Sequence, residues 1–138
     1  MAPPRVFSAW ADPESKRRWF AGDDADHHLD FRVGGEEVNH ARHEGVRLTF
    51  ESLYRDIVAD ERIIYTSVRS QDDRPATVSL TTVEFHDVGH GTRLVLTEQG
   101  TFLDGLEQPA WREQGTGDWL DALGVELGNA FKAGEDHS

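Results

Sequence analysis

The chain has 138 residues, a length typical of one domain that buries a hydrophobic core without disulfides or metals. It contains no cysteine, which excludes a disulfide framework and a thiolate metal site. Acidic residues outnumber basic ones by 26 to 14, and the resulting net charge of −12 makes nucleic acid or an anionic membrane an unfavourable partner. No apolar run approaches the ~20 residues of a membrane span, and no signal peptide is visible, so we expect a cytoplasmic protein.

The N-terminal segment predicts two short helices that meet at Asp12. In the first helix, Val6, Phe7 and Trp10 lie on one side at helical spacings. Asp12 can then cap the second helix, with Pro13 at its first position.

From Asp26 onward the hydrophobic period changes to two, which predicts strands. The first strand extends to Val33, and Gly34-Gly35 permits a tight hairpin turn that would place residue 29 roughly opposite residue 40. Short polar or glycine-containing breaks separate the later runs, so we expect an antiparallel meander. These runs are Glu37 to Arg42, Val46 to Ile57, Arg62 to Arg69, Thr77 to Phe85 and Thr92 to Gln99.

The C-terminal part predicts a long amphipathic helix, because its apolar residues recur on one helical face. This stripe consists of Trp111, Trp119, Leu120, Leu123, Leu127 and Phe131. Two short helices, several strands and a long helix predict an α+β fold with one curved antiparallel sheet packed on the helix. We expect a single domain over residues 1–132 and a frayed tail over residues 133–138.

Several segments resemble, in a fixed order, a known family. They are Ala2 to Trp10, Phe31 to Gly35, Tyr54 to Ile57 with Glu61 to Thr66, Gly91 to Thr97, and Arg112 to Gly115 with Trp119 to Leu123. Together they resemble a START-like (SRPBCC) domain, specifically the bacterial homologues of the heat-shock-protein ATPase activator. The resemblance implies a helix-grip fold around an apolar cavity, which serves more often as a container than as a catalyst.

One departure from the family concerns its first strand. Family members carry a full strand before the Pro-Pro-Arg-Val-Phe segment, and that strand lies beside the last one. Here only Met1 and Ala2 precede Pro3, so either the gene start is short or the domain does without this strand. The strand at Thr92–Gln99 would then have an unpaired edge, which proteins usually cover. We therefore expect that a second copy of the chain covers it in a homodimer.

If the sheet wraps the helix, alternate strand residues point into the space between them. Leu94 and Leu96 should face inward, and Glu98 should share their face. A mostly apolar pocket with a few polar groups is typical of a small-molecule site, although the same side chains could simply fill a core. The candidate ligand-binding residues are Phe31, Phe50, Tyr54, Tyr65, Ser79, Thr81, Glu98, Trp111, Trp119 and Leu123.

Glu98 is the sharpest single candidate for chemistry. A carboxylate that faces an apolar cavity could act as an acid, as a base or as an anchor for a ligand. The alternative is that Glu98 lies at the end of its strand, already in water.

Seven histidines suggest a metal hypothesis, since His27, His28, His40 and His43 lie near the first hairpin. A zinc site needs three or four converging ligands, and the adjacent His27 and His28 point to opposite faces of a strand. No spacing such as His-Glu-x-x-His occurs. We therefore expect no metal and no cofactor, and give these histidines a polar or pH-sensitive surface role.

The sequence offers little support for nucleophilic catalysis, because it has no cysteine and no Gly-x-Ser-x-Gly elbow. The leading hypothesis is a domain that binds an apolar small molecule and has no covalent chemistry of its own. One alternative is an enzyme of the polyketide cyclase or aromatase type, in which Glu98 or Tyr65 moves a proton. Another is a protein-interaction module that activates a heat-shock ATPase.

Overall fold

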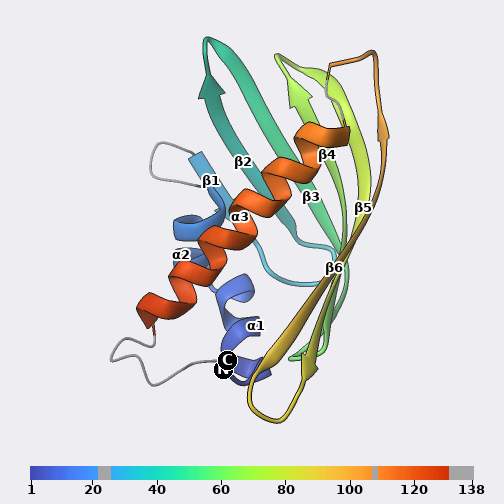
Figure 1. Cartoon of the computed structure of the whole chain (residues 1–138). Coiled ribbons are helices and arrows are strands. Elements are labelled where there is room, and N and C mark those ends of the chain that lie inside the picture. Colours follow the sequence, from blue (N-terminus) through green and yellow to red (C-terminus); the bar gives the residue numbers. More distant parts are fainter. Residues whose placement is uncertain (22–25, 107–108, 131–138) are drawn as a thin grey trace.

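The computed structural model of the protein describes residues 1–21, 26–106 and 109–130 (Figure 1). The tail predicted for residues 133–138 lies outside these ranges, as does Phe131 of the predicted helical stripe. The end of the domain at residue 132 therefore stays a prediction.

The N-terminal helices form as predicted. They are α1 (Pro3–Ala11), α2 (Pro13–Lys16) and a π-helical turn, η1 (Arg17–Ala21), that continues α2. The carboxylate of Asp12 accepts a hydrogen bond from the backbone N–H of Ser15 at 3.3 Å, which confirms the predicted cap. Val6, Phe7 and Trp10 are buried and anchor α1 on the core.

Six strands form one antiparallel sheet, and each strand pairs with its neighbours in sequence. The strands are β1 (Asp26–Leu29), β2 (Glu36–His43), β3 (Val46–Val58), β4 (Arg62–Gln71), β5 (Arg74–Asp87) and β6 (Thr92–Phe102). This order confirms the predicted meander. Figure 1 shows that the long strands curve, so that the sheet has a concave side.

The prediction for the first hairpin was wrong. Strand β1 ends at Leu29, which pairs with Glu37, whereas the prediction had placed residue 29 opposite residue 40. Residues 30–35 form a wider loop, in which the N–H of Gly35 closes a turn onto the carbonyl of Arg32 at 2.8 Å and the glycine pair also bonds to β3. The N–H of Gly34 donates to the carbonyl of Tyr54 at 2.8 Å, and the N–H of Tyr54 donates to the carbonyl of Gly35 at 3.0 Å. A Cβ at Gly35 would collide with the carbonyl oxygen of Asp30, so this position requires glycine.

The long helix α3 (Pro109–Ala130) crosses the concave side of the sheet diagonally (Figure 1). Its C-terminal half covers the main core, where Leu123 packs with aromatic side chains from the N-terminal helices. Trp119 makes close ring contacts with Trp10, Trp19 and Phe20, with centroids 5.5 to 5.8 Å apart. This arrangement is the α+β helix-grip fold that the resemblance implied.

Strand β6 lies at one edge of the sheet and is hydrogen-bonded to β5 alone among the described strands. Near its start, the hydroxyl of Thr92 donates to the carbonyl oxygen of Met1 at 2.7 Å. The sheet therefore ends in a long edge strand, the kind of edge that proteins usually protect.

None of the helices within the described ranges is both long enough and apolar enough to cross a membrane.

Candidate functional site

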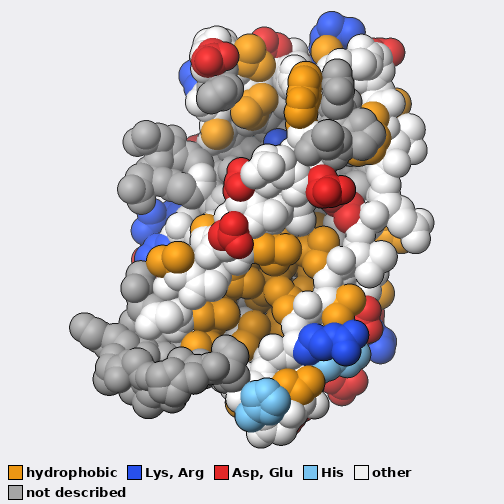
Figure 2. Space-filling view, viewed as in Figure 1, with side chains coloured by type: hydrophobic (Ala, Val, Ile, Leu, Met, Phe, Trp, Pro, Cys, Tyr) orange, Lys and Arg blue, Asp and Glu red, His pale blue; other side chains and the backbone are white. Residues whose placement is uncertain are grey.

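A cavity of about 550 Å³ lies between α3 and the concave side of β5 and β6. Figure 2 shows hydrophobic side chains exposed in the gap between α3 and β6. The described residues that line the cavity are Thr77, Ser79, Leu94, Leu96, Glu98, Gly100, Phe102, Glu113, Thr116, Gly117 and Leu120.

Small residues on both walls leave this space open. On the sheet, Ser79 and Gly100 lie directly opposite each other in register. On the helix, Gly117 lines the cavity, and a Cβ built there meets no heavy atom within 4 Å. Protein interiors are normally close-packed, so large side chains at these three positions would fill the gap.

Apart from Phe102, which ends β6, the apolar and polar lining residues lie toward different ends of the cavity. Leu94 and Leu96 come from the first half of β6, and Leu120 from the middle of α3. Glu98 lies further along β6, and Glu113 and Thr116 belong to the N-terminal part of α3. Because α3 starts near the end of β6 (Figure 1), these polar residues lie toward the same end of the cavity. The cavity is therefore amphipathic along its length.

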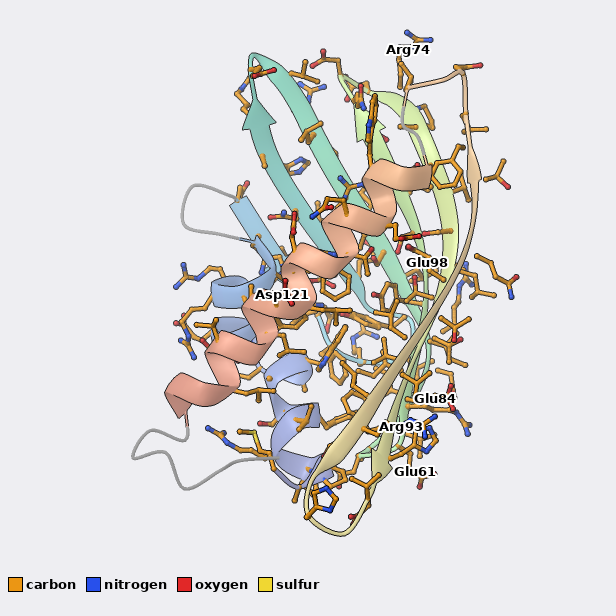
Figure 3. The ribbon with its side chains drawn as sticks, viewed as in Figure 1. Glu61, Arg74, Glu84, Arg93, Glu98 and Asp121 are labelled. Carbon is orange, nitrogen blue, oxygen red and sulfur yellow. The ribbon has the colours of Figure 1, made fainter. Side chains whose placement is uncertain are left out.

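Glu98 takes the inward orientation expected from its strand position. Figure 3 shows it between α3 and β6, whereas Glu84 and Arg93 lie on the outer side of the sheet. The Thr81 hydroxyl donates to the Glu98 carboxylate at 3.4 Å, and these two residues are paired across β5 and β6. Glu98 is half-buried, so its carboxylate reaches the cavity without being sealed from water.

Thr116 is a polar group of this cavity that the sequence analysis did not single out. Its Oγ1 is buried and has no hydrogen-bond partner within the described protein. Buried hydroxyls almost always have a partner, and the lack of one costs free energy. This oxygen is enclosed even in the empty cavity, so Thr116 adds a buried polar atom to the wall and not a hydroxyl that the cavity exposes.

The structure brings only part of the predicted site together. Ser79 and Glu98 line the cavity, and Thr81 is buried behind Glu98. Trp111 is 58 % exposed and lies away from the core. The other predicted residues belong to the core or pack against it: Phe31, Phe50, Tyr54, Tyr65, Trp119 and Leu123. These six residues therefore belong to the main core and do not line the cavity.

A buried polar cluster, which the sequence analysis also missed, lies under the N-terminal helices. The carboxylate of Glu37 accepts hydrogen bonds from Lys16 Nζ at 3.0 Å and from the Tyr54 hydroxyl at 2.9 Å. His27 Nε2 lies 2.7 Å from the second oxygen of Glu37. The side chains of Lys16 and Glu37 are each only 1 % exposed. We call these four residues, Lys16, His27, Glu37 and Tyr54, the buried cluster.

Aromatic rings enclose the ammonium group of the buried cluster. Lys16 Nζ lies 4.5 Å from the ring centroid of Phe20, 5.1 Å from that of Trp10 and 5.4 Å from that of Trp19. Cation–π attraction is strongest at such water-excluded sites. The rings and the carboxylate together replace the water that a lysine loses on burial.

The pKa values within the buried cluster move in opposite directions. Burial by itself raises the pKa of Glu37, but the charge of Lys16 and the hydrogen bonds from His27 and Lys16 outweigh it and hold this pKa below its usual range. Burial, followed by the Glu37 charge, raises the pKa of Tyr54 well above its usual value. Glu37 is therefore held ionised and Tyr54 neutral.

The alternation of strand residues could have indicated part of this cluster. Glu37 and Tyr54 are buried residues of β2 and β3, and the predicted site included Tyr54 but no residue of β2. Lys16 gave no comparable signal, because a four-residue helix has no hydrophobic period to read. The error in the first hairpin also displaced Glu37 from its true partner, Leu29.

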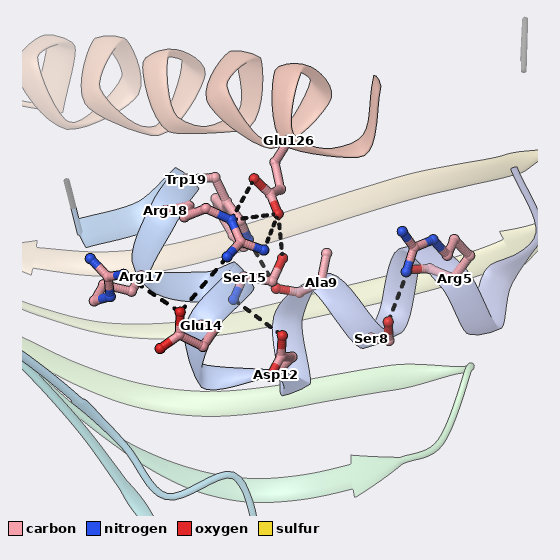
Figure 4. Close-up of polar contacts among 10 residues, drawn as sticks. All are labelled: Arg5, Ser8, Ala9, Asp12, Glu14, Ser15, Arg17, Arg18, Trp19 and Glu126. Atoms are coloured by element: carbon pink, nitrogen blue, oxygen red, sulfur yellow. Dashed lines mark hydrogen bonds and ion pairs between the residues drawn. The ribbon is translucent and has the colours of Figure 1, made fainter. Parts of the chain in front are cut away.

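The C-terminal half of α3 is fastened to the N-terminal helices by a separate set of polar contacts (Figure 4). The Arg18 guanidinium donates to both carboxylate oxygens of Glu126, with its shortest contact at 2.8 Å, and the Ser15 hydroxyl donates to the same carboxylate at 3.1 Å. The hydrogen bond from Arg18 is the main reason that the pKa of Glu126 is lowered. These contacts hold the C-terminal half of α3, whereas the cavity lies under its N-terminal half.

The histidines gather around no metal position in the described part of the chain, where no three His, Cys, Asp or Glu side chains converge. His27 contacts Glu37, as described above, and His40 Nδ1 lies 3.2 Å from the hydroxyl of Thr49.

The profile of the family described as "Activator of Hsp90 ATPase homolog 1-like protein" matches residues 1–128. A solved protein of Rhizobium leguminosarum is 41% identical with a TM-score of 0.89, covering 93% of this chain and 88% of that chain. A protein of Rhizobium loti is 43% identical with a TM-score of 0.86, covering 91% and 89%. A protein of Chromobacterium violaceum, 24% identical with a TM-score of 0.74 over 91% and 89%, shares the fold. Comparison with curated proteins gives no match.

Proposed function

Because this chain belongs to the Activator of Hsp90 ATPase homolog 1-like family and holds an amphipathic cavity under α3, we propose that it binds a small, largely apolar molecule there. The observation that carries the proposal is the cavity itself. Its volume of about 550 Å³ falls in the range of small-molecule sites, and its wall combines apolar surface with a few polar groups. Family membership alone would not specify this function.

The proposal requires that the ligand occupies the space between β6 and α3. Substitution of glycines on α3 tests this directly. Gly117 lines the cavity, whereas Gly124, one heptad further along α3, is exposed and does not. A Cβ at either position meets no heavy atom within 4 Å. Replacing Gly117 by leucine should therefore fill the cavity, and the same replacement at Gly124 serves as a matched control.

The experiment is a fluorescence titration with N-phenyl-1-naphthylamine, a neutral apolar probe that brightens when it leaves water. The wild-type protein and Gly124→Leu should bind the probe with the same affinity, and Gly117→Leu should bind it at least about tenfold more weakly, the loss expected when much of the buried apolar contact is removed. Equal binding by all three proteins, or none by the wild type, would exclude this cavity as the ligand site.

A second proposal concerns assembly: two copies of the chain pair through the free edge of β6. The supporting observation is that β6, over Thr92–Phe102, is hydrogen-bonded to β5 alone among the described strands. Lysine on an edge strand opposes such pairing, so the double variant Thr97→Lys/Gln99→Lys should be monomeric where the wild type is a dimer. Sedimentation velocity at micromolar concentration tests this, and a monomeric wild type would contradict the proposal.

The two alternative functions draw on other features. A cyclase-type enzyme would use polar groups that converge in the cavity, and the pair of Thr81 and Glu98 is the contact that favours it. An interaction module would use exposed apolar side chains, of which Val78 and Leu80 lie on the outer face of β5. We also propose that the protein is located in the cytoplasm.

A further inference from the structure

The floor of the cavity is broader at one end than at the other. At the broad end, Thr77 and Ser79 of β5 line the cavity beside Phe102 and Gly100, their register partners on β6. Neighbouring strands lie about 4.8 Å apart, so this end is two strands wide. Ser79 and Gly100 are small, and a Cβ built on Gly117 of the facing helix meets no heavy atom within 4 Å. We call this part the wide end, and it has room for a ring.

At the other end, the described residues of the floor come from β6 alone. We call this part, formed by Leu94, Leu96 and Glu98, the narrow strip. It covers four residue steps, or about 13 Å of strand. The register partners of these residues on β5 are almost fully buried and do not line the cavity: Phe85, Val83 and Thr81.

The core covers β5 beside the narrow strip. The ring centroid of Phe85 lies 5.4 Å from that of Phe7 and 6.3 Å from that of Trp10, both of which belong to α1. Val83 is buried in the same core. Only the width of β6 is therefore left to the cavity. Because hydrocarbon carbons pack about 4 Å apart, a floor one strand wide accommodates one chain that lies along it.

We propose that the ligand has two parts, a ring that lies at the wide end and a single unbranched hydrocarbon tail that lies along the narrow strip. This inference rests on the proposed function of the cavity and specifies the ligand class. The ring would lie between Gly100 of the sheet and Gly117 of the helix. The tail would extend past Leu96 to Leu94, and a branched tail, which is broader and shorter, would bury less apolar surface there.

Two isomers with the same formula test the tail. 4-Octylphenol has an unbranched tail, and 4-tert-octylphenol has a branched one. Equilibrium dialysis at pH 7, below the solubility limit of each compound, measures the two dissociation constants. The unbranched isomer should bind at least about tenfold more tightly, since each methylene that loses its buried contact weakens binding about fourfold.

A substitution in the narrow strip should change this discrimination. Leu96→Ala widens the strip and should reduce the difference between the isomers to about threefold or less. Val95→Ala is the matched control, because Val95 is the next residue on β6, does not line the cavity and shares the outer face with Arg93 (Figure 3). It should retain the tenfold difference. Each comparison is made within one variant, so a change of stability alone leaves the ratio unaltered.

Gly100→Val tests the ring at the wide end. A Cβ at this position meets the carbonyl oxygen of Val78 at 3.4 Å, an ordinary contact, and valine suits a strand, so the fold should be retained. The added side chain occupies part of the wide end. It should weaken binding of 4-octylphenol at least about tenfold and that of 1-decanol, an unbranched chain without a ring, by less than about threefold.

The outcomes separate this inference from the function on which it rests. If N-phenyl-1-naphthylamine binds but the two isomers bind the wild type equally, the inference fails and the cavity remains a binding site. An unchanged ratio in Leu96→Ala, or equal losses of 4-octylphenol and 1-decanol in Gly100→Val, would likewise overturn it. If neither the probe nor any of the three ligands binds, both the function and the inference fail.

Discussion

The buried cluster and the cavity place polar groups on the same concave side of the sheet but satisfy them differently. In the buried cluster, Glu37 accepts from Lys16 and Tyr54 and contacts His27, and both Lys16 and Glu37 are almost completely enclosed. In the cavity wall, Thr116 has a buried hydroxyl that has no hydrogen-bond partner among the described residues. The buried cluster thus satisfies its own polar groups, whereas the wall of the cavity encloses a hydroxyl that the described residues leave unpaired.

The comparison therefore assigns the two regions different roles. The buried cluster ties α2 and η1 to the sheet, because Lys16 reaches from α2 to Glu37 on β2. The cavity lies at the opposite half of α3, where glycine and small polar residues take the place of large aromatic ones. We expect substitutions in the first region to change stability and substitutions in the second to change binding.

The largest expected effect follows from breaking the buried ion pair. Glu37→Leu leaves the Lys16 ammonium enclosed without its carboxylate and should lower the free energy of unfolding by about 3–5 kcal/mol. The double variant Lys16→Met/Glu37→Leu removes both charges and should recover most of that loss. Urea denaturation of the three proteins measures both effects. A single variant that loses less than about 1 kcal/mol would show that the cluster contributes little to stability.

The pH dependence of stability should reveal the same carboxylate. The pKa of Glu37 is lower in the folded protein than its ordinary value of 4.5. Its contribution to stability is therefore complete above pH 4.5 and is lost as the pH falls through the lower folded-state pKa, by about 1.4 kcal/mol for each unit between the two pKa values.

Denaturation of the wild type and of Glu37→Gln between pH 3 and pH 7 tests this sign. The difference between the two proteins should be greatest above pH 4.5 and should shrink in acid, where the protonated side chain resembles glutamine. A difference that stays constant with pH would contradict the lowered pKa.

Removal of one hydroxyl from each region sharpens the comparison further. Tyr54→Phe leaves Glu37 short of a buried donor and should lower the free energy of unfolding by about 1–3 kcal/mol. Thr116→Val removes a hydroxyl that bonds to none of the described residues and should leave stability unchanged or raise it slightly. Thermal and urea unfolding measure both variants. An equal loss in the two would mean that Thr116 is satisfied in solution and would weaken the contrast between the regions.

The smallest expected effect is a gain of stability on α3. Gly124 is exposed within the helix, and an added methyl group meets no heavy atom within 4 Å. Gly124→Ala should therefore raise the free energy of unfolding by about 0.5–1 kcal/mol through helix propensity, with no change in probe binding. A destabilised Gly124→Ala would contradict the expected gain from helix propensity.

The sequence alone determined the elements and the fold class. Periods of two and of about 3.6 residues are local properties, so the strands from β2 onward and the helix α3 could be predicted within a few residues. Asp12 and Pro13 marked the start of α2 in the same way. Alternation along β6 also placed Leu94, Leu96 and Glu98 on one face, which the structure confirms.

The tertiary structure decided the register of the first hairpin and the content of the site. The glycine pair at residues 34 and 35 suits a tight turn locally, but it also forms hydrogen bonds with Tyr54 on β3, a residue about twenty positions further along the chain. Lys16 likewise meets Glu37 only because two elements pack together. Whether an inward residue fills the core or lines a cavity depends on the volumes of the side chains that face it, such as Ser79, Gly100 and Gly117. Which side chains face one another is known only from the tertiary structure.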